Sequence, residues 1–150
     1  MSLFSTSWRG FNRSLDKLAP LGDFTVRLWL FTVFFISGYN KFLNWDTTVI
    51  VFQYEYHVPL FSPYWAALLA TSIELFIPIL ILLGLGGRLP AFILFIFNLV
   101  AVISYPFLWT DAGWVGLKDH IHWGLLIMLI MFHGTGRWSM DYVYRLWRHR

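Results

Sequence analysis

The sequence predicts an all-α membrane protein: a bundle of four transmembrane helices preceded by an amphipathic helix at the membrane surface. Of its 150 residues, 58% are hydrophobic and only 13% are charged, which leaves too little polar surface for a soluble domain of this size. Four apolar segments are each close to the ~20 residues that a helix needs to cross a bilayer. These segments cover about residues 24–43, 65–85, 89–107 and 121–138.

Residues 1–20 predict a helix that lies on the bilayer. Apolar side chains recur at alternating spacings of four and three, which places them on one helical face. They are Phe4, Trp8, Phe11, Leu15 and Leu18. The opposite face carries Arg9, Arg13 and Lys17, cations suited to anionic lipid headgroups. A disordered basic tail is the alternative, because the stretch also contains serine and asparagine.

Basic residues divide unevenly between the two sides of the predicted bundle. If the N-terminus is cytoplasmic, only Lys41 and Lys118 of the eleven lysines and arginines lie on the outer side. The positive-inside rule therefore predicts that both termini are cytoplasmic. The cations form no single patch, so the net charge of +3 indicates no binding of nucleic acid.

Two connections between the segments have recognisable features. In the long outer loop, Asp46 is suited to cap a short helix that runs to about Tyr56 and ends before Val58-Pro59. The apolar content of this loop predicts that it lies over the bundle. Between the second and third segments, "LGLGGRLPA" predicts a tight turn in which Pro90 begins the next helix.

Glu74 lies near the middle of the second segment, about 15 Å below the membrane surface at 1.5 Å per residue. A charged carboxylate there costs at least ~2.5–3 kcal/mol unless it faces other helices, water or a partner. Pro78 lacks an amide hydrogen, so the backbone carbonyl of Glu74 loses its usual helical donor. Glu74 is therefore the best candidate for a catalytic residue, in a ligand or proton site. A structural ion pair that fixes the helix register is the alternative.

Polar and aromatic side chains on the other segments complete a predicted ligand-binding set around Glu74 and Pro78. They are Arg27, Tyr39, Lys41, Asn98, His122 and Trp123. They are expected to line a pocket between the helices, since intramembrane polar groups usually face the bundle interior.

Signals for metals and cofactors are weak. His57 and His120, both placed in the outer loops, are the candidates for a metal site. On a helix His120 and His122 would point about 160° apart, so these two cannot bind one ion together. The chain has no cysteine and no visible haem or flavin motif, so its cofactor is unknown and a quinone is the candidate.

Several short pieces of the sequence carry a family resemblance through their order and spacing. They are Arg27 with "FFISGYNKF", "VPLFSPYWAALLATSIE" ending on Glu74, "LLGLGGR" ending on Arg88, and "GTGRWSMD" with Gly134, Gly136, Ser139 and Asp141. The chain resembles the DoxX family of small four-helix bacterial membrane proteins. The resemblance implies one domain over residues 1–150 in the bacterial inner membrane. Members often have a histidine near the end of the third span, where this chain reads "AVISYPFLW".

The resemblance also implies two functions of different classes. Some DoxX relatives are the membrane subunit of thiosulfate:quinone oxidoreductase, which implies a redox-linked, quinone-linked subunit that binds a lipid-soluble ligand near Glu74. As an enzyme, such a chain would be an oxidoreductase subunit that requires a protein partner. The alternative is a non-enzymatic anchor, assembly factor or transport component for a partner protein or a metal-binding peptide system. The expected partners are the lipid bilayer and a protein subunit, with homo-oligomers left open.

Overall fold

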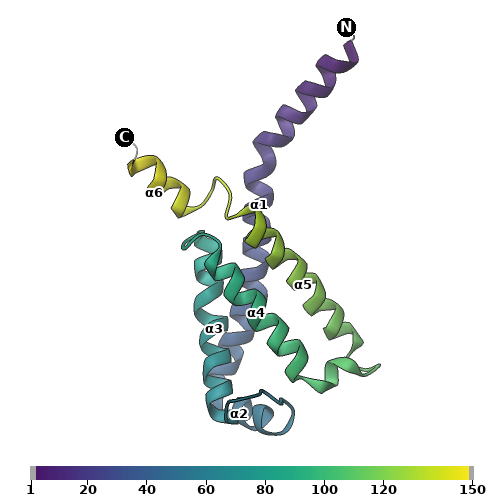
Figure 1. The fold of residues 1–150 in the computed structure, drawn as a ribbon, viewed down its shortest axis with the longest axis vertical. Helices are drawn as coiled ribbons and strands as arrows, with labels where there is room; N and C mark the ends of the chain where they lie inside the picture. The colour runs from purple at the N-terminus through teal and green to yellow at the C-terminus, as the bar shows by residue number, and fades with distance from the viewer. Residues whose placement is uncertain (1–2, 149–150) are drawn as a thin grey trace.

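The computed structural model of the protein describes residues 3–148, with side chains described from residue 8 onward. These residues form six α-helices and one 3-10 helix and contain no strand, which confirms the all-α class (Figure 1). The elements are α1 (Leu3–Leu43), α2 (Trp45–Tyr54), α3 (Pro63–Leu83), α4 (Leu89–Ser104), η1 (Pro106–Trp109), α5 (Trp114–His133) and α6 (Met140–Arg148). The side chain of Phe4 and the whole of Arg150 lie outside the described residues.

The helices α1, α3 and α5 are long and apolar enough to cross a membrane. The helix α4 is also apolar, but it has only 16 residues. At 1.5 Å per residue it is about 24 Å long, shorter than the ~30 Å hydrocarbon core of a typical bilayer. The chain is thus a helical membrane protein with three helices of spanning length within residues 3–148.

The predicted boundary between a surface helix and the first span is wrong, because α1 is one continuous helix of 41 residues. Pro20 lies inside it. A proline removes only one helical hydrogen bond, here to the carbonyl of Asp16, and the neighbouring Leu18, Ala19 and Leu21 favour helix. The first half of α1 extends beyond the bundle as a lone helix (Figure 1).

The last long helix is also displaced from its prediction of 121–138. Helix α5 begins at Trp114, because the stretch "WVGLKDH" is helical although Lys118 and Asp119 interrupt its apolar character. It ends at His133, since Gly134 adopts a φ of 88°, which residues with a side chain rarely adopt. The third segment stops at Ser104 instead of residue 107, because Pro106 disfavours helix at the preceding residue.

The loop between α1 and α3 contains the expected short helix with a different start. Asn44 precedes α2 as its N-cap, so the prediction that Asp46 caps the helix is wrong. Asp46 instead lies in the first turn, where its negative charge interacts favourably with the positive end of the helix dipole. Phe52 is buried in a cluster with alanines of α3, so α2 packs over the bundle as expected.

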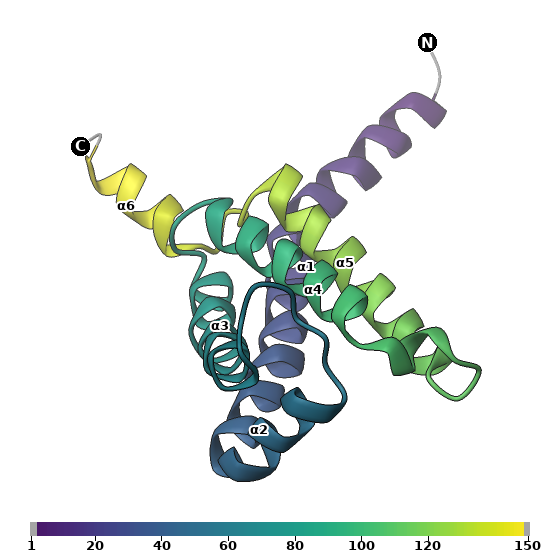
Figure 2. The same cartoon turned by 60° about the horizontal axis from the view of Figure 1, so that its bottom comes forward.

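The bundle has one main core between α1, α3, α4 and α5. In Figures 1 and 2, α4 and α5 run side by side and α3 lies beside α1. The core consists of the buried side chains Leu30, Phe34, Ile81, Ala91, Leu94, Ile127 and Ile130. The bundle has two ends, one beside α2 and the other beside α6 (Figure 1). We call them the α2 end and the α6 end after the helix found at each.

Candidate functional site

A cavity of about 490 Å³ lies between the helices toward the α2 end. Its wall is mostly aliphatic and aromatic and comes from α1, α2, α3, α4, α5 and the loop after α2. The polar or ionisable side chains in this wall are Ser37, Lys41, Tyr56, Glu74, Ser104 and His120. An apolar cavity with a few convergent polar groups is the usual form of a small-molecule site. We refer to it as the Glu74 cavity.

The carboxylate of Glu74 is buried, at 5% exposed, and its cationic partner is Lys41. The ammonium nitrogen of Lys41 donates to both carboxylate oxygens, at 2.8 Å to Oε1 and 2.6 Å to Oε2. The same nitrogen donates to Ser37 Oγ at 2.8 Å, and that hydroxyl donates to Oε1 at 3.3 Å. Ser37 lies one helical turn before Lys41, so α1 presents both groups to α3 on one face.

Gly38 explains how α1 and α3 approach closely enough for this ion pair. A Cβ atom at Gly38 would lie only 2.7 Å from the Cβ of Glu74 and 3.1 Å from the backbone nitrogen of Leu75. Real Cβ atoms essentially never show such a short contact. The absence of a side chain at Gly38 therefore allows α1 and α3 to approach closely at the position where Lys41 binds Glu74.

On the other side of the cavity, Asn98 of α4 holds His120 of α5. The amide nitrogen of Asn98 donates to the backbone carbonyl of His120 at 3.0 Å, and its oxygen lies 2.8 Å from Nδ1 of the His120 ring. A carbonyl only accepts, so the amide nitrogen must face it and the amide oxygen must face Nδ1. Nδ1 then carries the proton of the neutral ring. This tautomer leaves the lone pair on Nε2, which can accept a proton or a hydrogen bond.

A stack of three aromatic rings borders the cavity next to Ser104. Phe52, Tyr56 and Tyr105 stack in order, each pair with centroids 4.6 Å apart. Burial raises the pKa of the Tyr56 hydroxyl, and the charges of Tyr105, Glu74 and Glu55 raise it further, so Tyr56 stays a neutral donor. The hydroxyl of Ser104 is buried and has no hydrogen-bond partner among the described residues. A buried hydroxyl without a partner is costly, and a bound ligand would satisfy it.

Arg27 does not approach Glu74, although the sequence placed both in one set. Its guanidinium is 1% exposed and donates to the backbone carbonyls of Leu82 at 2.8 Å and Trp138 at 2.6 Å. It also lies 5.6 Å from the ring centroid of Phe24. A Cβ atom at Gly84 would lie 2.9 Å from Arg27 Nη1 and against Ser139, so no space is left around the charge. Arg27 thus joins α1, α3 and the segment before α6.

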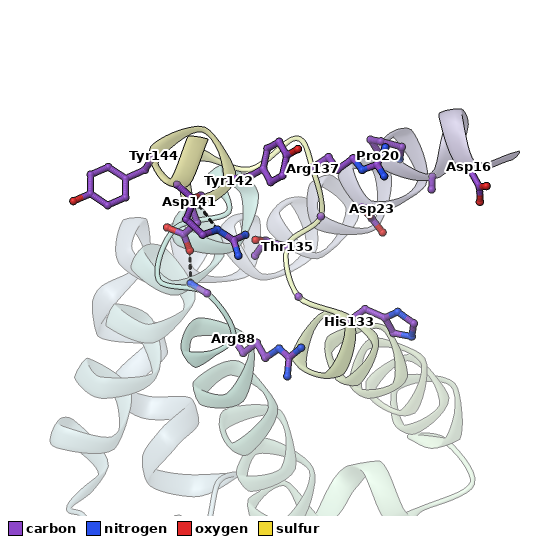
Figure 3. A pocket seen from close by; sticks show the side chains of 15 residues that line it. Asp16, Pro20, Asp23, Arg88, His133, Thr135, Arg137, Asp141, Tyr142 and Tyr144 are labelled. Atoms are coloured by element: carbon purple, nitrogen blue, oxygen red, sulfur yellow. Dashed lines mark hydrogen bonds between the residues drawn. The ribbon is translucent and has the colours of Figure 1, made fainter. Parts of the chain in front are cut away.

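The glycine-rich turn after α3 and the segment before α6 form one joint with Arg27. The backbone nitrogen of Asp141 donates to the carbonyl of Gly84 at 3.2 Å. In return the Asp141 carboxylate accepts from the backbone nitrogen of Gly87 at 2.6 Å (Figure 3). It also accepts from the backbone nitrogen of Gly86 at 3.4 Å. The pieces "LLGLGGR" and "GTGRWSMD" therefore meet in space. We call this cluster the Arg27 joint.

The remaining predicted site residues are spread around the bundle. Trp123 lines the Glu74 cavity and packs edge-on against His120 at 4.8 Å between centroids. Tyr39 is 48% exposed and stacks on Phe35, outside the cavity. Pro78 is buried in α3 but does not line the cavity. His122 is exposed.

The predicted metal role of His57 and His120 gains no support. His57 is exposed, whereas His120 lies in the cavity wall against Asn98. Residues 3–148 contain no group of three or more histidine, aspartate or glutamate side chains that could hold a metal ion. His120, and not the predicted His122, lines the cavity, because α5 begins before both of these residues and the face that carries His120 packs against α4.

Tyr56 and Ser104 line the cavity without having been predicted. Ser37, a candidate partner of Glu74, also lines it, one helical turn before Lys41 on the same face of α1. For Tyr56 and Ser104 the sequence holds no comparable signal, because Tyr56 lies in the loop after α2 and Ser104 ends α4, and only tertiary packing brings them to the cavity. The backbone nitrogen of His57 donates to the carbonyl of Ser104 at 2.7 Å and fixes that loop.

The comparison with protein families agrees with the motifs in the sequence. The family model described as DoxX matches residues 22–106, more than half of the chain. The match contains Lys41, Glu74 and Asn98, and it ends before α5 with His120. No curated protein and no solved structure matches the chain. The resemblance drawn from the sequence is thereby confirmed, and the chain belongs to the DoxX family.

Proposed function

We propose that this DoxX protein is the membrane subunit of a redox-linked system and that it binds a lipid-soluble quinone in the Glu74 cavity. One observation carries the proposal. A single, mostly apolar cavity gathers an ion pair, an imidazole whose tautomer is fixed, and a buried hydroxyl without a partner among the described residues. A quinone ring is flat and apolar and has two carbonyl oxygens that need donors, so its chemistry is complementary to this wall.

The donors and acceptors of the cavity suit both redox states of such a ring. The hydroxyls of Tyr56 and Ser104 can donate to quinone oxygens, whereas Nε2 of His120 can accept from a quinol hydroxyl. Reduction of a quinone to a quinol consumes two electrons and two protons. His120 and Glu74 are the proton carriers in the wall, and an electron-donating protein partner supplies the electrons.

The proposed orientation follows from the distribution of charge. Eight of the ten lysines and arginines within residues 8–148 lie on the side of the Arg27 joint or in its flanking helices, which favours a cytoplasmic α6 end in a bacterial inner membrane. In this arrangement α4 with η1 is the fourth, short crossing, and the Glu74 cavity lies in the outer half of the bilayer. The partner that supplies electrons would then bind on the outer side.

The alternative function has its own supporting observation. Lys41 and Glu74 neutralise each other through two short hydrogen bonds, as a purely structural ion pair would. The protein would then be a non-enzymatic anchor, or an assembly or transport component, and the cavity would hold only lipid. In the proposed function the cavity selects a ligand that carries carbonyl groups, whereas in the alternative it does not.

A binding measurement with a matched control tests the proposal. Purified protein in lipid nanodiscs is titrated with radiolabelled decylubiquinone, together with the variants His120→Gln and His122→Gln. The two histidines lie two residues apart on α5, but only His120 faces the cavity. We expect saturable binding of the ligand. After its reduction to the quinol, binding should weaken about tenfold in His120→Gln, because one hydrogen bond from the quinol hydroxyl to Nε2 is lost, and should not change in His122→Gln. Absence of saturable binding, or equal loss in both variants, would exclude the quinone site and favour the anchor.

A further inference from the structure

A second cavity, of about 830 Å³, lies at the α6 end, remote from the Glu74 cavity. It is bordered by the first half of α1, the start of α4, the end of α5 and the segment leading into α6 (Figure 3). Because α3 ends at Leu83 and α5 at His133, the cavity lies at the level where the apolar helices end. This is the level of the lipid headgroups in a bilayer. We call it the Arg88 pocket.

Two guanidinium groups of the Arg88 pocket are available to a ligand. Within residues 8–148 the one ion pair joins Lys41 and Glu74, so neither Arg88 nor Arg137 has a carboxylate within 4.0 Å. Arg88 also directly precedes α4, where the N-terminal end of the helix dipole adds positive potential. Guanidinium groups bind phosphate through paired hydrogen bonds.

Thr135 adds a neutral polar group to the same wall. The residue is only 7% exposed, and its hydroxyl makes no hydrogen bond within the part of the chain that is described. It lines the pocket close to the Gly134 and Gly136 backbone. An accessible hydroxyl without a protein partner that borders an open pocket is a ready donor for a ligand oxygen.

The pocket also contains carboxylates, and these decide what kind of phosphate it suits. Asp141 is already held by the backbone nitrogens of Gly86 and Gly87. Asp16 and Asp23 lie along α1, across from Arg88 (Figure 3), and neither forms an ion pair within residues 8–148. A purely anionic ligand would be repelled by these two carboxylates, whereas an ammonium group would be attracted.

We propose that the Arg88 pocket binds a phosphate ester that carries an ammonium group, namely the headgroup of phosphatidylethanolamine. The phosphate contacts Arg88, Arg137 and Thr135, and the ammonium lies toward Asp16 and Asp23. A lipid is favoured over a soluble phosphate ester, because the pocket lies at the ends of the apolar helices and exposed apolar residues such as Leu21 and Leu89 flank it.

Native mass spectrometry of the full chain tests this assignment. The protein is released from nanodiscs that contain equal amounts of phosphatidylethanolamine and phosphatidylglycerol, and the retained lipids are counted. We expect selective retention of phosphatidylethanolamine, reduced about tenfold by Arg88→Gln and by the pair Asp16→Asn with Asp23→Asn. The controls are Arg148→Gln and the pair Asp111→Asn with Asp119→Asn. They make the same charge changes outside the pocket and should leave retention unchanged.

Two further results decide the source and the chemistry. Equal retention of phosphatidylglycerol would show that no ammonium is recognised and would overturn the assignment. Soluble phosphoethanolamine, titrated by isothermal calorimetry, should bind far more weakly than the lipid, and equal affinity would overturn the lipid source. The variant Arg88→Lys keeps the charge but loses the paired hydrogen bonds, so it should retain lipid better than Arg88→Gln. Its thermal unfolding midpoint shows whether the fold is intact.

Discussion

Helix α1 carries one buried or half-buried cation toward each end of the bundle, and the two are held in opposite ways. Arg27 donates to two backbone carbonyls in a joint without free space, whereas Lys41 donates to a carboxylate in the wall of a cavity. They are 14 residues apart, or about 21 Å along the helix. A carbonyl never changes its charge and cannot leave the backbone, but a carboxylate can take a proton and rotate. An intramembrane cation is therefore a functional candidate only when its partner can take up a proton or move and when a cavity lies beside it.

The largest expected effect is at Arg27. The variant Arg27→Met removes the donor of two backbone carbonyls and should lower the free energy of unfolding by about 3 kcal/mol. Arg27→Lys should recover only part of this loss, because one ammonium replaces a fork that spans two carbonyls. Unfolding in mixed detergent micelles measures both variants. A loss below about 1 kcal/mol in Arg27→Met would show that the joint does not hold the bundle together.

The contact between Gly38 and Glu74 gives the next effect. Gly38→Ala should cost about 2 kcal/mol, since its Cβ atom would force α1 and α3 apart. Gly22→Ala is the matched control on the same helix, because a Cβ atom there would have no neighbour within 4 Å. That control should be neutral or stabilising by up to about 1 kcal/mol through helix propensity. Similar unfolding free energies for the two variants would contradict the close crossing.

The ion pair itself separates stability from binding. Lys41→Met alone should cost about 2 kcal/mol, because it leaves the Glu74 carboxylate buried without its cation. The double variant Lys41→Met with Glu74→Met should return to within about 1 kcal/mol of the natural protein, as apolar replacements of buried ion pairs often do. Under the proposed function both variants lose decylubiquinone binding. Retention of binding by the double variant would make the pair structural, like the Arg27 joint.

The smallest effect is expected at the aromatic stack. Tyr105 donates to Glu55 at 2.9 Å, and both burial and this hydrogen bond raise the pKa of its hydroxyl. Burial likewise raises the pKa of Tyr56. A raised folded-state pKa gives stability that is complete below the unfolded value of about 10 and is lost as the pH rises through the folded value. Unfolding midpoints should therefore fall above about pH 10. Tyr105→Phe should reduce this dependence and cost below about 1 kcal/mol.

The sequence predicted the class of the fold and the helices that are apolar throughout. The second segment, predicted at 65–85, became α3 at Pro63–Leu83, because apolar composition and a spanning length coincide there. Helix α5 escaped the same reasoning. Its first turns contain the charged residues Lys118 and Asp119, which lower the mean hydropathy. Hydropathy measures the preference of a segment for lipid and not its preference for helix. The continuity of α1 through Pro20 was equally invisible, since a proline usually marks a helix boundary.

The sequence predicted a site residue only where its position in the membrane has a clear free-energy cost. A carboxylate in a membrane segment attracts attention, so Glu74 was found, and Lys41 was among the few cations in reach. The partners of Arg27 were not predictable, because they are carbonyls of Leu82 and Trp138 and any residue supplies a carbonyl. The choice between His120 and His122 depends on which face of α5 meets Asn98, and that is decided by tertiary packing.

The partners of Arg27 and Lys41 also imply an order of assembly during synthesis. Glu74 alone in lipid costs at least ~2.5–3 kcal/mol, and Lys41 relieves this cost as soon as α1 and α3 are both made. The N-terminal helix pair is thus expected to insert as one unit, before α4 and α5 exist. Arg27 has to wait for Trp138, near the end of the chain, before its second carbonyl arrives. The Lys41 end of α1 therefore forms its tertiary contacts early in biogenesis, whereas the Arg27 end completes its contacts last.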